Sequence, residues 1–147
     1  IGEGSIFYGW LITNRGNIET TKSYGRSLNV IAHGTVTGRT SNGTCTMNYK
    51  TFDGRTLQCQ RTANGRYTVW IPTKWNLQPD DYLVMLTGVG YIMDSSSNSS
   101  PVKATLTAKT SSYFVVDISD DDSWNNGSFE FQIINMNDFT YNGDIKD

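Results

Sequence analysis

Residues 102–109 read VKATLTAK and carry the clearest strand pattern in the chain. Apolar side chains alternate with polar ones along all eight positions, and successive side chains of a strand point to opposite faces of its sheet. The apolar positions are Val102, Ala104, Leu106 and Ala108, and the polar positions are Lys103, Thr105, Thr107 and Lys109. The stretch predicts a half-buried strand with one face in a core and the other in water.

Further segments with strand-like sequence lie on both sides of this stretch. Strands are predicted over 5–12, 28–37, 44–49, 56–61, 66–71, 82–91, 102–109, 113–118 and 128–134. In the stretch 66–71, Tyr67, Val69 and Ile71 share one face. About nine strands with short connections, and no alternating helical segments, predict an all-β protein folded as an antiparallel β-sandwich.

Turn-forming residues divide these strands. Asp53-Gly54 predicts a hairpin that joins 44–49 to 56–61, and Asn64-Gly65 predicts a second turn before 66–71. Gly88 and Gly90 indicate a bulge or a close approach of two backbones. Residues 94–100 form a polar loop that Pro101 closes.

The chain has two cysteines, Cys45 and Cys59, and neither belongs to a C-x-x-C motif. A three-residue turn at Asp53-Gly54 would set the two sulfurs out of register, whereas a five-residue loop would set Cys45 opposite Cys59. The tighter turn is the stronger signal, so two buried free thiols are predicted. Pairing of the two cysteines stays open.

Size and charge restrict the class of protein. The 147 residues suffice for one domain, and Asp and Glu exceed Lys and Arg for a net charge of −2. No cluster of basic residues indicates nucleic-acid binding. No apolar run is long enough to span a membrane, so membrane insertion is not expected.

Three segments are predicted. Residues 1–27 form an N-terminal arm or interface strand that joins an upstream shaft, residues 28–140 the β-sandwich domain, and residues 141–147 a C-terminal tail. The chain begins without Met, which suggests a piece of a longer polypeptide. The run SIFYGWLI at 5–12 is apolar enough to need a partner surface, either its own sandwich or neighbouring copies.

The stretch from Ala32 to Ile133 resembles the C-terminal head domain of bacteriophage tail fibres and related receptor-binding proteins. The residues that carry the resemblance are AHGTV at 32–36, GRYTV at 65–69, DYLV at 81–84, SYFVV at 112–116 and FEF at 129–131. The resemblance implies a homotrimeric head on a virion fibre. It also implies upstream fibre or virion proteins as partners, and a bacterial surface glycan or surface protein as receptor.

Aromatic residues in loops are the candidate ligand-binding residues, because sugar rings stack on aromatic side chains while amides and carboxylates bind their hydroxyls. The candidates are Trp75, Tyr91 and Trp124, with Asp122, Asn125 and Asn126 beside Trp124. Each of the three aromatic residues could equally be a lid on the core.

Catalytic and metal-binding motifs are weak. The single histidine, His33, has no nucleophile motif beside it, and it reads as a structural or surface residue. The acidic run 120–122 could bind Ca²⁺, but its spacing does not match an EF-hand and favours a solvated turn. We therefore expect no enzyme activity, no metal and no cofactor.

The favoured function is a tail-fibre-like head domain that binds a bacterial surface receptor, preferably a glycan, by multivalent adhesion. Two alternatives remain. One is a monomeric carbohydrate-binding module or adhesin domain of a cellular protein, and the other is a structural virion component that does not adsorb. The expected location is the virion, outside the cell when the domain acts.

Overall fold

The computed structural model describes residues 29–93, 96–120 and 125–137, and all regular structure in them is β-strand apart from two short 3₁₀ turns, η1 (Thr73–Trp75) and η2 (Pro79–Asp81). The strands are β1 (Asn29–Val36), β2 (Gly43–Thr44), β3 (Met47–Thr51), β4 (Gln58–Ala63), β5 (Arg66–Trp70), β6 (Tyr82–Val89), β7 (Tyr91–Met93), β8 (Ser99–Pro101), β9 (Lys103–Lys109), β10 (Tyr113–Ser119) and β11 (Ser128–Asn135). The all-β prediction is confirmed. Eight of the nine predicted strands fall within the described residues, and the three short strands β2, β7 and β8 account for the difference from eleven.

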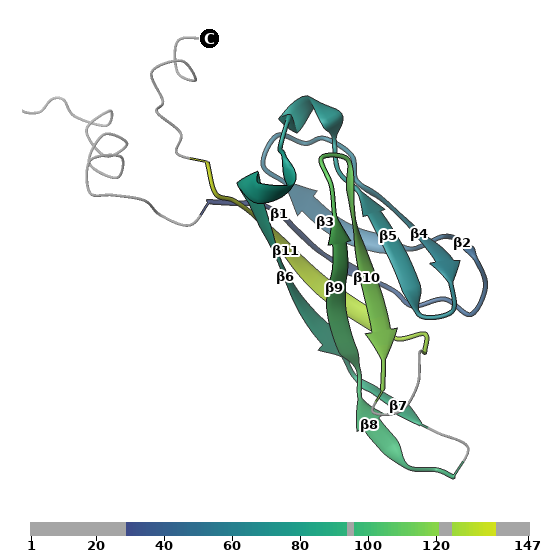
Figure 1. Ribbon diagram of the computed structural model, residues 1–147. Coiled ribbons are helices and arrows are strands. Elements are labelled where there is room, and N and C mark those ends of the chain that lie inside the picture. The colour runs from purple at the N-terminus through teal and green to yellow at the C-terminus, as the bar shows by residue number, and fades with distance from the viewer. Residues whose placement is uncertain (1–28, 94–95, 121–124, 138–147) are drawn as a thin grey trace, which may run out of the picture. The chain divides into compact units, whose positions relative to one another are not determined.

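The strands form two main sheets, and every pair is antiparallel (Figure 1). Sheet A has the order β3-β1-β11-β6, and sheet B has the order β2-β4-β5-β10-β9. A third, two-stranded sheet joins β7 to β8. The long ladder between β1 and β11 pairs residues about one hundred positions apart, so the fold depends on contacts distant in sequence.

Both sheets contribute to a single hydrophobic core. Tyr67 of β5 packs edge-on against Phe129 of β11 with ring centroids 5.7 Å apart, and Phe114 of β10 lies 5.9 Å from Phe131. These four rings are at most 2% exposed. Burial of each such side chain contributes about 1.5–3 kcal/mol, so these contacts across the two sheets are a main source of stability.

The alternation predicted for individual strands is confirmed for the apolar positions of 66–71, although Thr68 on the opposite face is also buried, and only in part for 102–109. Tyr67, Val69 and Ile71 are all buried, as expected for one face of 66–71. In β9, the apolar positions face inward as far as Leu106. A bulge in the β9–β10 ladder then shifts the register between Val115 and Val116, and Ala108 is exposed.

The predicted hairpin at Asp53-Gly54 is wrong. β3 pairs with β1 in sheet A, whereas β4 pairs with β2 and β5 in sheet B. The turn is present, with Gly54 at φ +77°, but it carries the chain from one sheet to the other. The turn at Asn64-Gly65 does join two paired strands, β4 and β5, with Gly65 at φ +70°.

Gly88 marks a close approach of two backbones, as predicted. A Cβ atom built on Gly88 would lie 1.9 Å from the carbonyl oxygen of Val102. The chain leaves β6 at this point, forms the β7–β8 ribbon and returns through Val102 into β9 (Figure 1). No side chain fits where this ribbon begins.

Several predicted segments lie outside the described residues. They are the arm 1–27 with its apolar run 5–12, the tail 141–147, and Asp121, Asp122 and Trp124 of the acidic loop. Cys45 and Cys59 are described, and both are buried free thiols. The prediction that a tight turn at Asp53-Gly54 sets the two sulfurs out of register is wrong. Cys45 lies opposite Cys59 in the ladder that continues from β2 and β4.

Candidate functional site

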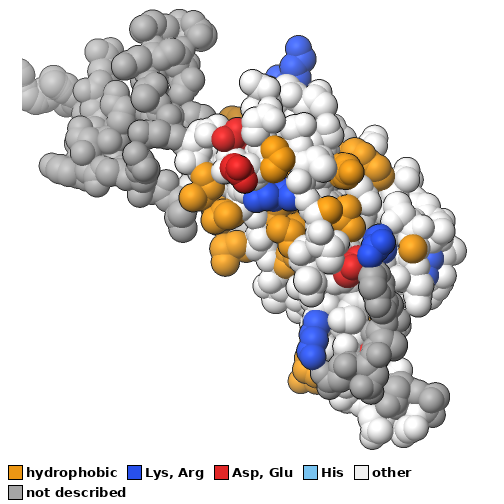
Figure 2. Space-filling model, in the orientation of Figure 1, with side chains coloured by type: hydrophobic (Ala, Val, Ile, Leu, Met, Phe, Trp, Pro, Cys, Tyr) orange, Lys and Arg blue, Asp and Glu red, His pale blue; other side chains and the backbone are white. Residues whose placement is uncertain are grey.

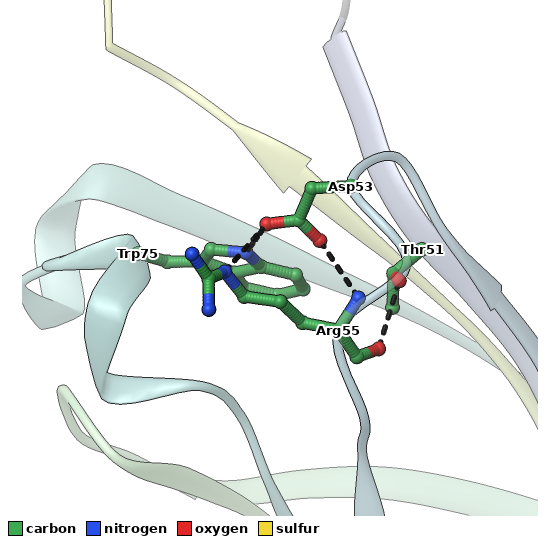
Figure 3. Close-up of polar contacts among 4 residues, drawn as sticks. All are labelled: Thr51, Asp53, Arg55 and Trp75. Carbon is green, nitrogen blue, oxygen red and sulfur yellow. Dashed lines mark hydrogen bonds and ion pairs between the residues drawn. The ribbon is translucent and has the colours of Figure 1, made fainter.

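The first predicted ligand-binding residue, Trp75, lies in η1, and its indole is already engaged. Its Nε1 donates a hydrogen bond to Oδ2 of Asp53 over 2.8 Å (Figure 3). Its ring lies 5.9 Å from that of Phe52 and packs partly against the core. The lid interpretation therefore describes Trp75 better than the ligand-binding one.

Asp53 is the centre of this contact. Its Oδ1 accepts from the backbone N–H of Arg55, and its Oδ2 accepts from Nε of Arg55 over 2.9 Å as well as from Trp75. Desolvation raises the pKa of Asp53, but the hydrogen bonds from Trp75 and Arg55 outweigh it, and the net pKa is below its usual value. The contacts of the Asp53 carboxylate stabilise the turn at Asp53-Gly54.

Asn126 has a structural role. Its amide oxygen accepts from Nε of Arg61 over 2.9 Å and from the backbone N–H of Gly65 over 3.2 Å. Arg61 is only 9% exposed, and it also donates to the side-chain oxygens of Asn42 and Asn64. Asn125 accepts from the backbone of Asn126. These amides hold a buried guanidinium and three loops together.

Tyr91 is the remaining described candidate. It lies on β7 and is 72% exposed, with no ring partner among the described aromatic residues. Trp75 lies by η1 at one end of the sheets, whereas the β7–β8 ribbon lies at the opposite end (Figure 1). The described candidates therefore do not form one site, and Trp124 and Asp122 lie outside the described residues.

A different feature has the geometry of a binding site. A groove with a volume of about 530 Å³ lies on sheet A and is lined by residues of all four of its strands. The lining residues are His33, Gly34, Thr35, Asn48, Tyr49, Lys50, Met85, Leu86, Thr87, Glu130, Phe131 and Gln132. Pockets of roughly 300–1,000 Å³ are typical of small-ligand sites.

Strand register arranges the outward-facing side chains of this groove in two rows. One row runs Lys50, His33, Gln132 and Met85, and the next runs Asn48, Thr35, Glu130 and Thr87. Residues two positions apart on a strand share a face, so both rows lie on the same side of sheet A. We call these eight side chains the groove rows.

The polar atoms of the groove rows are available to a ligand. Within the part of the chain that the structure describes, none of their side chains forms a hydrogen bond or an ion pair. They provide amides, hydroxyls, an imidazole, one ammonium and one carboxylate, so donors and acceptors lie side by side. This contrasts with Asp53 and Asn126, whose polar atoms are already used.

No sequence pattern identifies this groove. Alternation at 33/35 and 130/132 predicts that each pair lies on one face of its strand. The sequence does not predict the order of the strands, because β1 pairs with β11 through contacts between distant parts of the chain.

No metal centre is found among residues 29–93, 96–120 and 125–137, where no three His, Cys, Asp or Glu side chains come together. Within the same residues, no helix has the length and apolar character needed to cross a membrane. No known protein family, curated protein or solved structure matches the chain.

Proposed function

We propose that this chain is a non-catalytic adhesion domain that binds a bacterial surface glycan in the groove of sheet A. The observation that carries the proposal is the pair of groove rows: seven polar side chains and Met85 line a hollow, and the polar ones have no hydrogen-bond or ion-pair partner among the described residues. Glycans present many hydroxyl groups, and each hydroxyl both donates and accepts a hydrogen bond. Side chains that offer amides, hydroxyls and a carboxylate at neighbouring positions match that chemistry.

The position of the groove supports binding over catalysis. His33 is exposed on the surface of a sheet, and among the described residues that line the groove Glu130 has the only carboxylate. Glycoside hydrolysis in most families needs two carboxylic acids across the bond that breaks. A rigid sheet surface instead holds its side chains in fixed positions for recognition.

We further propose that the domain is the head of a virion tail fibre and acts outside the cell as a homotrimer joined to upstream fibre proteins. The sequence resemblance to tail-fibre heads supports this assignment. Linked copies would raise the avidity of a weak glycan site by a factor of roughly 10²–10⁴ when all sites reach one surface.

The edge of sheet A supports contact between copies. Among the described strands, β6 forms a hydrogen-bonded ladder only with β11, although β9 of sheet B lies close to it, and β6 contains no charged residue, no proline and no bulge. Leu83 and Val89, near the two ends of β6, are each at least 40% exposed, and Figure 2 shows hydrophobic side chains gathered over this side of the molecule. Edge strands of this kind pair with other chains unless they are protected.

The edge strand of sheet B, β9, has two features that protect an edge from pairing with another chain. β9, at the edge of sheet B, has lysines at both ends and a bulge in its ladder. Both devices prevent edge-to-edge pairing. Lys109 of β9 also donates from Nζ to the carbonyl oxygen of Tyr82, at the start of β6. The rest of β6 has neither device, and we propose that it contacts a second copy of this chain.

A monomeric carbohydrate-binding module is the second candidate function. The groove lies within a single chain and needs no partner copy to complete it, which favours this alternative. A structural virion component that does not adsorb would have no use for a polar groove. The solution mass and the binding test together separate these cases.

The test is a screen of bacterial capsular and lipopolysaccharide glycans with a variant that fills the groove. Thr35→Trp places a large ring between Asn48 and Glu130, and we expect it to abolish the glycan signal. Thr105→Trp, on the exposed face of β9, is the matched control and should retain binding. Glycan binding that survives Thr35→Trp in a folded protein would contradict the groove as the site. Binding of the wild type to a bacterial surface protein but to no glycan would contradict the glycan.

A further inference from the structure

Cys45 and Cys59 are directly opposed across a β-ladder. The register between β2 and β4 pairs Gly43 with Arg61 and Thr44 with Gln60, so the next pair is Cys45 with Cys59. The backbone N–H of Cys45 donates to the carbonyl oxygen of Cys59 over 2.8 Å, which continues the ladder to this pair. Both side chains point into the core and are 7% and 1% exposed.

This placement suits a disulfide. Opposed residues in an antiparallel pair have Cα atoms roughly 4.5–5.5 Å apart, inside the range of about 4.4–6.8 Å that disulfides need. A side-chain hydrogen bond between the two thiols lowers the pKa of Cys45 and raises that of Cys59, in addition to the larger effect of burial. Cys45 lies directly after the last residue of β2, and its backbone hydrogen bond holds it beside Cys59.

We propose that Cys45 and Cys59 form an intramolecular disulfide once the protein leaves a reducing compartment. The oxidant is a small-molecule disulfide such as oxidised glutathione. The Cys45 thiolate attacks one of its sulfurs, and the S–S bond breaks to release one glutathione thiolate. The Cys59 thiolate then attacks the Cys45 sulfur of the mixed disulfide and releases the second. The two cysteine protons end on two glutathione molecules, whose sulfurs take up the two electrons.

Burial determines which thiol reacts first and how fast. Desolvation is the main cause that raises the pKa of both thiols, and the shift is large for Cys59. Thiolate is the reactive form, so oxidation of the folded protein is slow. Cys45 is the more exposed of the two, and it is the one that a small disulfide reaches after local opening.

The disulfide would close a loop that contains β3 and the turn between the two sheets. A cross-link of this kind stabilises a protein mainly by restricting its unfolded chain. Proteins that fold in a reducing cytosol and act outside the cell meet this change of environment. The inference rests on the two cysteines alone, and it holds whether or not the groove binds a glycan.

The experiment uses the full chain, purified with reductant and then exchanged into oxidised glutathione at pH 8.5. We expect an intact mass lower by about 2 Da, a disulfide-linked peptide pair containing Cys45 and Cys59, and a thermal midpoint higher by roughly 5–10 °C that dithiothreitol reverses. Cys45→Ala and Cys59→Ala are the controls, and neither should show these changes.

A second arm separates slow reaction from unsuitable geometry. The chain is oxidised in urea, where both thiols are accessible, and is then refolded. A refolded, oxidised protein with a midpoint above that of the reduced protein supports the proposal. A midpoint below it, or glutathione adducts in place of the internal bond, overturns the proposal.

Discussion

The guanidinium Nε of Arg61 donates to the side-chain oxygen of Asn126 over 2.9 Å, and this contact joins strand β4 to the residues just before β11. Arg61 is almost fully buried, and the amide oxygens of Asn42 and Asn64 also accept from its guanidinium. A buried charge of this kind is stable only while its donors are used. Asn126 is therefore a structural residue in a loop that looks like a binding loop.

Asn126→Ala tests this role. Removal of the amide leaves a buried Arg61 donor and the Gly65 N–H without their acceptor, at a cost of about 1–3 kcal/mol. We expect a thermal midpoint lower by roughly 4–15 °C with glycan binding at the groove unchanged. Asn48→Ala is the control, since that asparagine is exposed and should change stability by less than about 0.5 kcal/mol. Equal midpoints for the two variants would contradict the assignment.

The carboxylate of Asp53 predicts a pH dependence. Its folded-state pKa is lowered from 3.8, so the charged form stabilises the native state above that pH, and the stabilisation is lost as pH falls through the lower, folded-state value. Asp53→Asn should therefore lower the thermal midpoint by a few degrees at pH 7.

That difference from the wild type should shrink as the pH falls below 3.8. Melting curves of both proteins at pH 7, 4 and 2.5 measure it, and Asp80→Asn in η2 serves as the surface control at pH 7. A difference that is the same at all three pH values would mean that the charge of Asp53 contributes nothing.

The exposed edge of β6 predicts an effect on assembly. Leu83→Lys and Val89→Lys place charges on the unprotected edge, which disfavours pairing with another chain. Light scattering with size exclusion should give three times 16.4 kDa for the wild type and a single chain for the double variant. Thr105→Lys on β9 should leave the mass unchanged. A wild type that runs as a monomer would contradict the proposed contact.

Local pattern predicted local structure well. The alternation of VKATLTAK as far as Leu106, and that of Tyr67, Val69 and Ile71, identified the inward faces because side-chain direction in a strand has period two. Asp53-Gly54 did form a turn. Turn chemistry does not determine which sheet each flanking strand joins, however, and here β3 and β4 join different sheets.

The candidate site was harder to predict from the sequence, because it depends on contacts between distant parts of the chain. Residue type indicated that Trp75 and Asn126 could bind a sugar, but it did not reveal that Asp53 and Arg61 already occupy their polar atoms. The groove depends on the register of β1 against β11 and on the order of four strands. Both are set by packing between distant parts of the chain.

Groove binding predicts a specific loss on a single amide deletion. Gln132 lies in the row with His33 and Met85, and its side chain is exposed toward the groove. Gln60 is an exposed glutamine on β4 of sheet B, which makes Gln60→Ala a matched control for Gln132→Ala. Both variants should keep the wild-type thermal midpoint, because neither side chain is buried.

The most direct measurement is titration calorimetry of the bacterial glycan that gives the strongest signal in the screen, with the wild type and these two variants. If the glycan binds in the groove, we expect its affinity to be at least about tenfold weaker for Gln132→Ala, equivalent to roughly 1.4 kcal/mol, and unchanged for Gln60→Ala. Equal affinity for Gln132→Ala and the wild type, or a folded wild type that binds no glycan, would contradict the groove as a glycan-binding site.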